Sequence, residues 1–232
     1  MHKYSSDWLT ETISALRSFK FEFLLLIEMY LVKTPSIFRW MYPNLIWKKS
    51  SKNTIFLTFD DGPIPEATPF VLDTLREYEA KATFFCIGDN VRKHPDVYRR
   101  ILDEGHSVGN HTFNHLKGWA TADDEYIENV DLCSQYVESD LFRPPYGRVK
   151  KSQIRALSKL NPNIKIIMWD VLSGDFDQKL KPEKCLRYVV KNTCPGSIVV
   201  FHDSIKAFPI LKDVLPKALE FWKRKGYEFD AL

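Results

Sequence analysis

The chain has 232 residues, of which 44% are hydrophobic and 14% aromatic, so it can bury a substantial core. It carries 33 basic and 30 acidic residues, giving a formal net charge of +3, and it contains no long run of lysines and arginines. These values exclude a disordered chain and predict no nucleic-acid partner, so we expect one large globular domain with an appendage.

Residues 1–52 are predicted to form a helical extension followed by a connection to the main domain. Apolar side chains recur there at helical spacing, at Leu9, Ile13, Leu16, Phe23, Ile27 and Leu31. This stripe predicts an amphipathic helix that packs on the main domain or on another subunit, with peripheral membrane contact as the alternative.

No membrane-spanning or secretory segment is expected. Lysine and glutamate interrupt the apolar stretch at residues 20–33. The longest uninterrupted run is therefore far shorter than the roughly 20 apolar residues needed to span a bilayer. A signal peptide requires a basic segment, a clean apolar core and a cleavage site, and this pattern is missing. We therefore expect a cytoplasmic protein, with Met29 as an alternative start, and the sequence indicates no oligomeric state.

The main domain is expected at residues 53–232, where apolar strand-like runs alternate with helix-like stretches. The strand-like runs are residues 54–59, 82–88, 106–111, 141–145, 164–170 and 197–203. Helices are expected at residues 71–78, 97–102, 126–137, 154–160, 183–190 and 211–222. Repeated β/α units with continuous apolar strands predict an α/β domain whose parallel sheet either closes into a barrel or stays open and doubly wound.

The four cysteines, Cys86, Cys133, Cys185 and Cys194, show no C-x-x-C spacing. We expect them to be buried free thiols, with a disulfide between Cys185 and Cys194 as the alternative.

Polar residues recur at the C-terminal ends of the predicted strands, where function collects in parallel α/β domains. They are Asp60 and Asp61, Asn110 and His111, Arg143, Asp170, and His202 and Asp203. A single polar residue after a strand is common, because strands end at the surface. The repetition of such residues predicts that they lie together at one rim of the sheet.

His111 and His115 are four residues apart, which is one helical turn, so two imidazoles can face one point as metal ligands must. Two surface histidines on a helix are the alternative interpretation. Asp60 and Asp61 are adjacent, and their mutual repulsion would raise the pKa of one of them. A divalent cation bound to one carboxylate removes that penalty and leaves the other free to accept a proton from a water.

Five separated motifs carry a resemblance to a known family. They are "TFDDGP" at 58–63, "HTFNH" at 111–115, "RPPYG" at 143–147, "WDVLSGDF" at 169–176 and "IVVFHD" at 198–203. In these motifs and their order the chain resembles the polysaccharide deacetylase family, carbohydrate esterase family four, over about residues 54–232. The resemblance implies a distorted (β/α) barrel, usually of seven strands.

The resemblance also implies a metal-dependent hydrolase that removes N-acetyl groups from amino sugars. By similarity, Asp61, His111 and His115 hold one divalent metal, with zinc expected and cobalt or nickel as alternatives. The substrate class is a peptidoglycan- or chitin-type oligo- or polysaccharide. A carbohydrate-binding module with impaired catalysis and an O-acetyl esterase on the same scaffold are the alternatives.

The resemblance assigns the catalytic roles in the same way. Asp60 is the expected catalytic base and Arg143 positions it. His202 is the expected general acid that protonates the departing amine, and Asp175 holds its ring. Histidine suits that role because its ordinary pKa allows proton donation near neutral pH.

Two further residues are expected to contact the substrate: the backbone N–H of Tyr146 helps to bind the oxyanion, and Trp169 lines the acetyl pocket. The fourth motif departs from the D-x-x-D-W pattern common in the family, because Leu172 and Phe176 replace its first acid and its tryptophan. Asp170 is the candidate substitute for the lost acid. The wall of the pocket is therefore expected to be reshaped.

Overall fold

The computed structural model describes residues 31–232. The predicted N-terminal amphipathic helix falls almost entirely on residues 1–30 and therefore lies outside the described residues. Within residues 31–232, the longest apolar helices are still too short or too polar to cross a bilayer.

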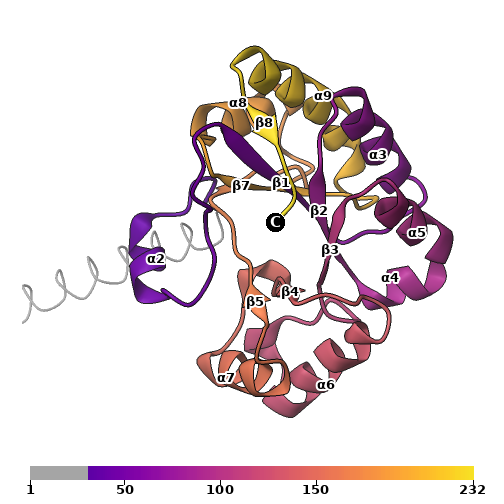
Figure 1. The fold of residues 1–232 in the computed structure, drawn as a ribbon, viewed down its shortest axis with the longest axis vertical. Helices are drawn as coiled ribbons and strands as arrows, with labels where there is room; N and C mark the ends of the chain where they lie inside the picture. The colour runs from indigo at the N-terminus through magenta and orange to yellow at the C-terminus, as the bar shows by residue number, and fades with distance from the viewer. Residues whose placement is uncertain (1–30) are drawn as a thin grey trace, which may run out of the picture. The chain divides into compact units, whose positions relative to one another are not determined.

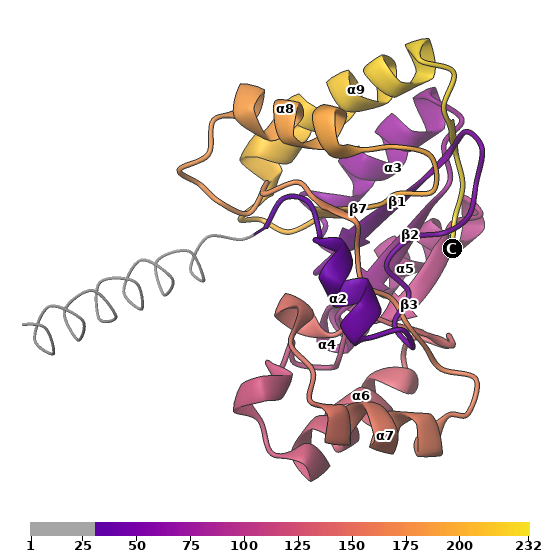
Figure 2. The ribbon, with the colours of Figure 1, turned by 90° about the vertical axis from the view of Figure 1, so that its left-hand side faces the viewer.

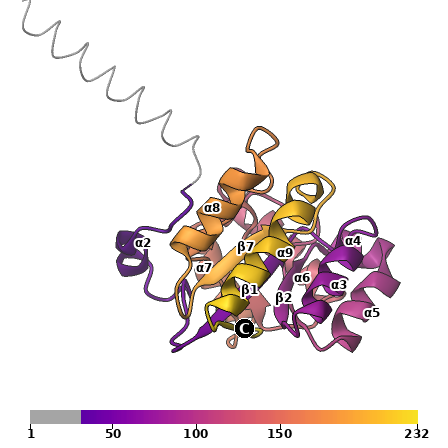
Figure 3. The same cartoon turned by 90° about the horizontal axis from the view of Figure 1, so that it is seen from above.

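Seven parallel strands form a curled half-barrel with helices around its outside (Figures 1 and 3). The strands follow the order β5-β4-β3-β2-β1-β7-β6, which confirms the predicted α/β barrel class. Their bounds are β1 Thr54–Asp60, β2 Ala82–Cys86, β3 Ser107–Asn110, β4 Leu141–Phe142, β5 Lys165–Ile166, β6 Val171–Leu172 and β7 Ile198–His202. A short strand, β8 (Glu228–Phe229), pairs with the beginning of β1.

The helices of the described residues largely follow the predicted alternation. They are α2 Ser36–Met41, α3 Thr68–Glu77, α4 Gly88–Lys93, α5 Pro95–Asp103, α6 Asp123–Ser134, α7 Lys151–Leu160, α8 Pro182–Asn192 and α9 Phe208–Arg224. Two short 3-10 helices, Gly118–Ala120 and Pro145–Gly147, follow β3 and β4. The helices α2 and α4 were not predicted, and the run at 164–170 forms a strand only at Lys165–Ile166 (β5), with β6 following directly after the run.

The core is built around β1, which lies in the middle of the sheet between β2 and β7. All of its residues after Thr54 are buried, because neighbouring strands cover both of its edges and helices cover its outer face. The ring of Phe59 stacks between Phe84 and Phe201 on the two neighbouring strands, with ring centroids 5.1 and 6.0 Å away. This packing fixes the end of β1, from which Asp60 projects.

Residues 32–49, which we call the N-terminal strap, run alongside the chain between β5 and β6 (Figure 2). Isolated backbone bridges join the strap to Ile167, Val171 and Ser197, and the helix α2 lies in its middle. The predicted division of the chain at residue 53 stays a prediction, but the strap shows that the segment before it is paired with the sheet.

All four cysteines are free, as predicted, and Cys86, Cys133 and Cys185 are buried, whereas Cys194 is only half-buried, in contrast to the prediction. Burial raises the pKa of the Cys133 thiol to about 12, so it stays protonated at physiological pH. These thiols therefore behave as small apolar core residues.

Candidate active site

The ends of β1 and β7 bring the two expected proton-transfer residues together. The register of these parallel strands places Asp60 directly opposite His202. The backbone N–H of Asp203 donates to the carbonyl oxygen of Asp60 over 3.1 Å, which extends this pairing by one residue. As predicted, the C-terminal rim of the sheet is therefore where the chemistry-bearing side chains meet.

Asp61, His111 and His115 converge beside this pair. Their donor atoms all lie within 4.8 Å of one another. The Oδ1 atom of Asp61 is 3.8 Å from Nε2 of His111 and 3.2 Å from Nε2 of His115. The three side chains come from two different loops, so the fold and not local sequence spacing creates the cluster.

The protonation states suit a cation between these three side chains. Burial lowers the pKa of His111 to about 4, which keeps its imidazole neutral, and its Nδ1–H donates to the carbonyl oxygen of Arg143 over 2.7 Å. Its Nε2 lone pair consequently points toward Asp61. Burial alone would raise the pKa of Asp61, but the hydrogen bond from His115 and the neighbouring histidines hold it well below its usual range. One carboxylate and two imidazoles therefore fit a divalent metal with open positions.

The histidine pair does not lie on a helix, in contrast to the expected helical turn. Residues 111–117 form an irregular loop in which Thr112 and His115 adopt positive φ angles of 62° and 58°. This backbone brings the two rings to a centroid distance of 5.1 Å. Asp61 also has a positive φ of 82°, so two of the three candidate ligands occupy conformations that side chains other than glycine rarely adopt.

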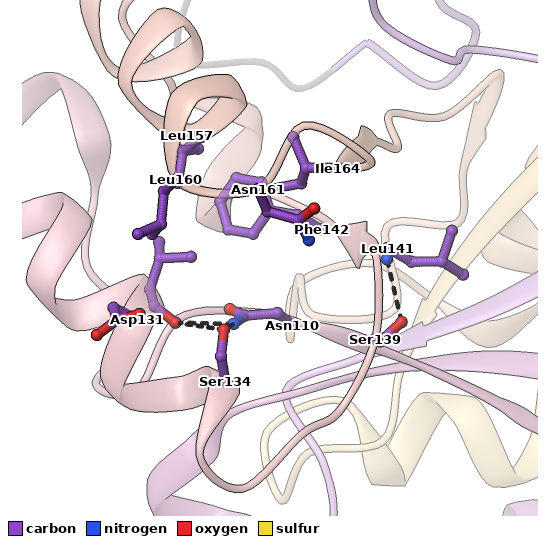
Figure 4. Close-up of a pocket in the computed structure, with 11 residues that line it drawn as sticks. Asn110, Asp131, Ser134, Ser139, Leu141, Phe142, Leu157, Leu160, Asn161 and Ile164 are labelled. Carbon is purple, nitrogen blue, oxygen red and sulfur yellow. Dashed lines mark hydrogen bonds between the residues drawn. The ribbon is translucent and has the colours of Figure 1, made fainter.

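Polar side chains next to the cluster hold this backbone in place. Asn110 Oδ1 accepts a hydrogen bond from the backbone N–H of Thr112, and its Nδ2 donates to Val130 and Ser134 on α6. These bonds to α6 lie at a cleft of about 190 Å3 between α6, α7 and the ends of β3 and β4 (Figure 4). Asn90 Nδ2 likewise donates to the carbonyl oxygen of Asp61 over 2.7 Å. Asn110 therefore faces α6 and supports the histidine loop.

Arg143 holds Asp60 in the manner expected from the resemblance. Its fully buried guanidinium donates from Nη1 to Asp60 Oδ1 and to Thr58 Oγ1, both over 2.7 Å. Its Nε and Nη2 donate to the carbonyl oxygens of Ile167 and Met168 over 3.3 and 3.1 Å. Contacts on both sides of the guanidinium thus hold Arg143 in place, and Arg143 in turn holds the Asp60 carboxylate in one orientation.

Asp175 binds His202 through two hydrogen bonds. Asp175 Oδ1 is 2.8 Å from Nδ1 of the His202 ring, and Oδ2 accepts from the His202 backbone N–H over 2.8 Å. Burial lowers the pKa of His202, but the charge and hydrogen bond of Asp175, together with Asp61 and Asp60, outweigh it and raise the pKa to about 9. The imidazole is therefore protonated at neutral pH and its Nε2–H is free to face a substrate.

Asp203 is a further residue of the site that the sequence did not single out for a role. Its buried carboxylate accepts hydrogen bonds from the backbone N–H of Gly62 over 3.0 Å and from Thr68 Oγ1 over 2.6 Å. A Cβ at position 62 would lie only 2.0 Å from Oδ2 of Asp203, so glycine is required there. Asp203 consequently fixes the turn that follows Asp61.

Two aromatic walls flank the site. The exposed ring of Tyr146 packs on His115 with a centroid distance of 4.6 Å, and Trp169 contacts Gly147 beside it. On the other side, Phe176 meets His202 edge-on with a centroid distance of 5.0 Å. Phe176 therefore occupies the wall that the altered fourth motif was expected to reshape.

Asp170 does not join the site, although its position after a strand predicted that it would. Its fully buried carboxylate binds Lys33 Nζ over 2.6 Å, Ser197 Oγ over 2.5 Å, and Arg39. Two of these partners belong to the N-terminal strap. The interpretation of Asp170 as a substitute acid is therefore wrong, because Lys33, Arg39 and Ser197 already bind its carboxylate.

Comparison with known proteins agrees with this geometry. The sequence model for polysaccharide deacetylases matches residues 48–163. A peptidoglycan-N-acetylglucosamine deacetylase of Bacillus cereus is 36% identical over 196 residues, which cover 82% of this chain and 88% of the relative. A chitooligosaccharide deacetylase of Azorhizobium caulinodans is 34% identical over 160 residues, which cover 66% of this chain and 75% of the relative.

The fold is similar to that of a solved relative. A crystal structure of a peptidoglycan N-acetylglucosamine deacetylase superposes with a TM-score of 0.76 at 31% identity, covering 86% of this chain and 95% of the other. Sequence and fold thus lead to the same group of proteins as the five motifs. The chain belongs to the polysaccharide deacetylase family, carbohydrate esterase family four.

Proposed function

We propose that this chain is a metal-dependent hydrolase that removes N-acetyl groups from amino sugars of an oligo- or polysaccharide. The observation that carries this proposal is the placement of Asp60 beside His202 at the ends of β1 and β7, next to the Asp61, His111 and His115 cluster. An amide needs both a base for the attacking water and an acid for the departing nitrogen.

The side chains of the site divide this work between them. Asp60, oriented by Arg143, accepts a proton from the attacking water, whose oxygen bonds to the acetyl carbon. His202, oriented by Asp175, donates its Nε2 proton to the sugar nitrogen as the C–N bond breaks, so that acetate and an amine leave. By similarity, the backbone N–H of Tyr146 donates to the carbonyl oxygen as charge develops on it.

A divalent cation held by Asp61, His111 and His115 would polarise the acetyl carbonyl and make the attacking water more acidic. We propose zinc, because two imidazoles and one carboxylate with open positions form a donor set typical of catalytic zinc sites, and cobalt or nickel fit the same donors. Acetate release from N-acetylated and O-acetylated oligosaccharides tests the function. Release from O-acetyl esters alone would favour the esterase, and no release from either would favour the binding module.

The metal site itself is tested by metal content. We expect the wild-type protein to bind one equivalent of zinc, and Asp61→Asn to weaken binding by more than the roughly 10- to 100-fold that loss of a supporting residue costs. Asparagine keeps the shape of the side chain but removes the negative charge that attracts the cation. Calorimetry and elemental analysis provide the measurement, with Asp96→Asn, at an almost fully exposed carboxylate, as the matched control. Unchanged zinc affinity in Asp61→Asn would contradict the assignment.

The charges around the site favour an anionic glycan. Lys117 Nζ lies 5.9 Å from the ring centroid of Tyr146, and Lys206 Nζ lies 5.9 Å from that of Phe176. Neither ammonium group forms an ion pair with an acidic side chain among residues 31–232. We propose that these two cations attract carboxylate groups on the sugars or substituents that flank the reacting one, which supports a peptidoglycan-type substrate over neutral chitin oligomers.

This preference leads to a second prediction. The double variant Lys117→Gln/Lys206→Gln should lower kcat/KM by roughly 3- to 10-fold on a carboxylate-bearing peptidoglycan oligosaccharide, because exposed charge pairs contribute up to about 1 kcal/mol each. With neutral N-acetylchitotetraose, kcat/KM should stay nearly constant. Lys159→Gln/Lys223→Gln, at the last turns of α7 and α9, is the matched control. An equal loss on both substrates would count against charge recognition.

A further inference from the structure

The orientation of Arg143 depends on a chain segment at the open end of the sheet. Two of its donors bind the carbonyl oxygens of Ile167 and Met168, which lie between the short strands β5 and β6. These two strands end the seven-strand path and do not pair with each other. The segment that carries these two carbonyl groups therefore has strand neighbours of the sheet on one side only.

The N-terminal strap supports this segment through its backbone. The N–H of Met168 donates to the carbonyl oxygen of Ile46 over 2.7 Å, and the N–H of Ile46 donates to that of Ile166 over 2.9 Å. Thr34, which is buried, donates from Oγ1 to the carbonyl oxygen of Trp169 over 2.8 Å and from its N–H to that of Asp170 over 3.0 Å. The strap thus forms hydrogen bonds with the same segment, residues 166–170, whose Ile167 and Met168 carbonyl oxygens bind Arg143.

A buried ion cluster fastens the strap at this place. Asp170 is fully buried, and its carboxylate pairs with Lys33 and Arg39, both of which belong to the strap. Lys33 Nζ also donates to the carbonyl oxygen of Asn192 at the end of α8 over 2.7 Å. An unpaired buried carboxylate is strongly destabilising, so Asp170 favours a single position of the strap.

We propose that the N-terminal strap is part of the active-site machinery, with Thr34, Lys33, Arg39 and Asp170 as positioning residues for the base. They fix the segment 167–170 so that Arg143 directs the carboxylate of Asp60 at the attacking water. This inference rests on the proposed function. The four positioning residues lie outside residues 48–163, the part of the chain that the family sequence model matches.

The test compares two substitutions of Thr34 in the full chain. Thr34→Val has nearly the same shape but lacks the hydroxyl that holds the Trp169 carbonyl, whereas Thr34→Ser keeps it. Because misplacement of a reacting group by about 1 Å can cost 100-fold in rate, we expect Thr34→Val to lower kcat by roughly 10- to 100-fold. KM and the zinc content should change little, and Thr34→Ser should restore kcat to within about threefold of wild type.

A second pair covers the case in which Thr34→Val does not fold. Arg39 is partly exposed, so Arg39→Gln removes one cation from Asp170 with less effect on the core, and Arg39→Lys keeps the charge. We expect kcat to fall in Arg39→Gln and to recover in Arg39→Lys. Folded, zinc-loaded Thr34→Val and Arg39→Gln proteins with kcat within twofold of wild type would overturn the inference.

A structural readout separates this inference from the proposed function. In a crystal structure of Thr34→Val, or of Arg39→Gln if that variant folds better, we expect the Ile167 and Met168 carbonyl groups and the Arg143 guanidinium to shift relative to Asp60. Unmoved groups would overturn the positioning role even if the wild-type protein released no acetate. Absence of acetate release from the wild-type protein, by contrast, would overturn the proposed function alone.

Discussion

Asp60→Asn is expected to abolish most acetate release while the protein keeps its metal. A positioned general base contributes roughly 100- to 10,000-fold to a rate, and an amide cannot accept the proton that Asp60 is proposed to take. The side-chain oxygen of asparagine can still accept the hydrogen bond from Arg143 Nη1, so the position of the residue should be kept. We therefore expect kcat to fall by that factor with nearly unchanged KM.

The same substitution also affects stability, and the experiment must separate the two effects. Loss of the carboxylate leaves the fully buried Arg143 without its counter-charge, which costs about 3–5 kcal/mol when a buried pair is broken. The thermal midpoint should therefore fall, and kcat should be expressed per folded, zinc-loaded protein. Asp96→Asn serves as the control for a surface carboxylate. Near-native kcat in folded Asp60→Asn would mean that another group is the base.

His202→Gln is expected to show the second large effect. Without the imidazolium, the amine must leave as a poor leaving group, so kcat should fall by roughly 100-fold or more. The metal should stay bound, because His202 lies outside the Asp61, His111 and His115 cluster. His94→Gln, between α4 and α5, is the matched control and should keep full activity. A His202→Gln variant that retains most of its activity would exclude this residue as the acid.

The pH profile provides an independent check on His202. Its pKa rises from 6.5 in the unfolded chain to about 9 in the fold, so the pair with Asp175 stabilises the fold fully below about 6.5. That contribution is lost as the pH rises through about 9. We expect activity to fall as the pH rises and His202 loses its proton. A cation bound at Asp61 would offset the negative charge of that carboxylate, so in the metal-loaded protein this fall should be centred below pH 9. Asp175→Asn should move this fall toward pH 6.5, and an unmoved fall would argue against the pair.

The β/α alternation could be predicted because buried parallel strands leave continuous apolar runs in the sequence. The strand predicted at 164–170 is much shorter in the structure, because only Lys165–Ile166 pairs with the sheet and Ile167 forms an isolated bridge with Ile46 of the N-terminal strap. The helix α2 falls in a segment with prolines and few apolar repeats, and none of its residues is buried. The position of α2 depends on contacts with residues distant in the sequence, such as the bond from Arg39 to Asp170, which is 131 residues away.

The candidate site was partly predictable for a similar reason. Residue identities at strand ends indicated Asp60, Asp61 and His111, and the family resemblance added the pairing of Arg143 with Asp60. The positive φ angles of Asp61, Thr112 and His115 could not be predicted, because local sequence favours other conformations at these residues and only the surrounding fold imposes them. The strand-end pattern likewise placed Asp170 at the rim but could not show which way its carboxylate faces.

The central position of β1 also governs the order in which this protein can assemble. Thr58 Oγ1 donates to the Val199 carbonyl oxygen across a sequence separation of 141 residues, so one edge of β1 finds its partner only late in synthesis. During translation, β1 to β5 can pair in turn while that edge, with its apolar side chains, stays open to association with other chains. Asp60 is made early and His202 near the end. The proposed acid–base pair is therefore complete only when β7 docks, and a nascent chain that stalls earlier exposes an apolar strand edge without that pair.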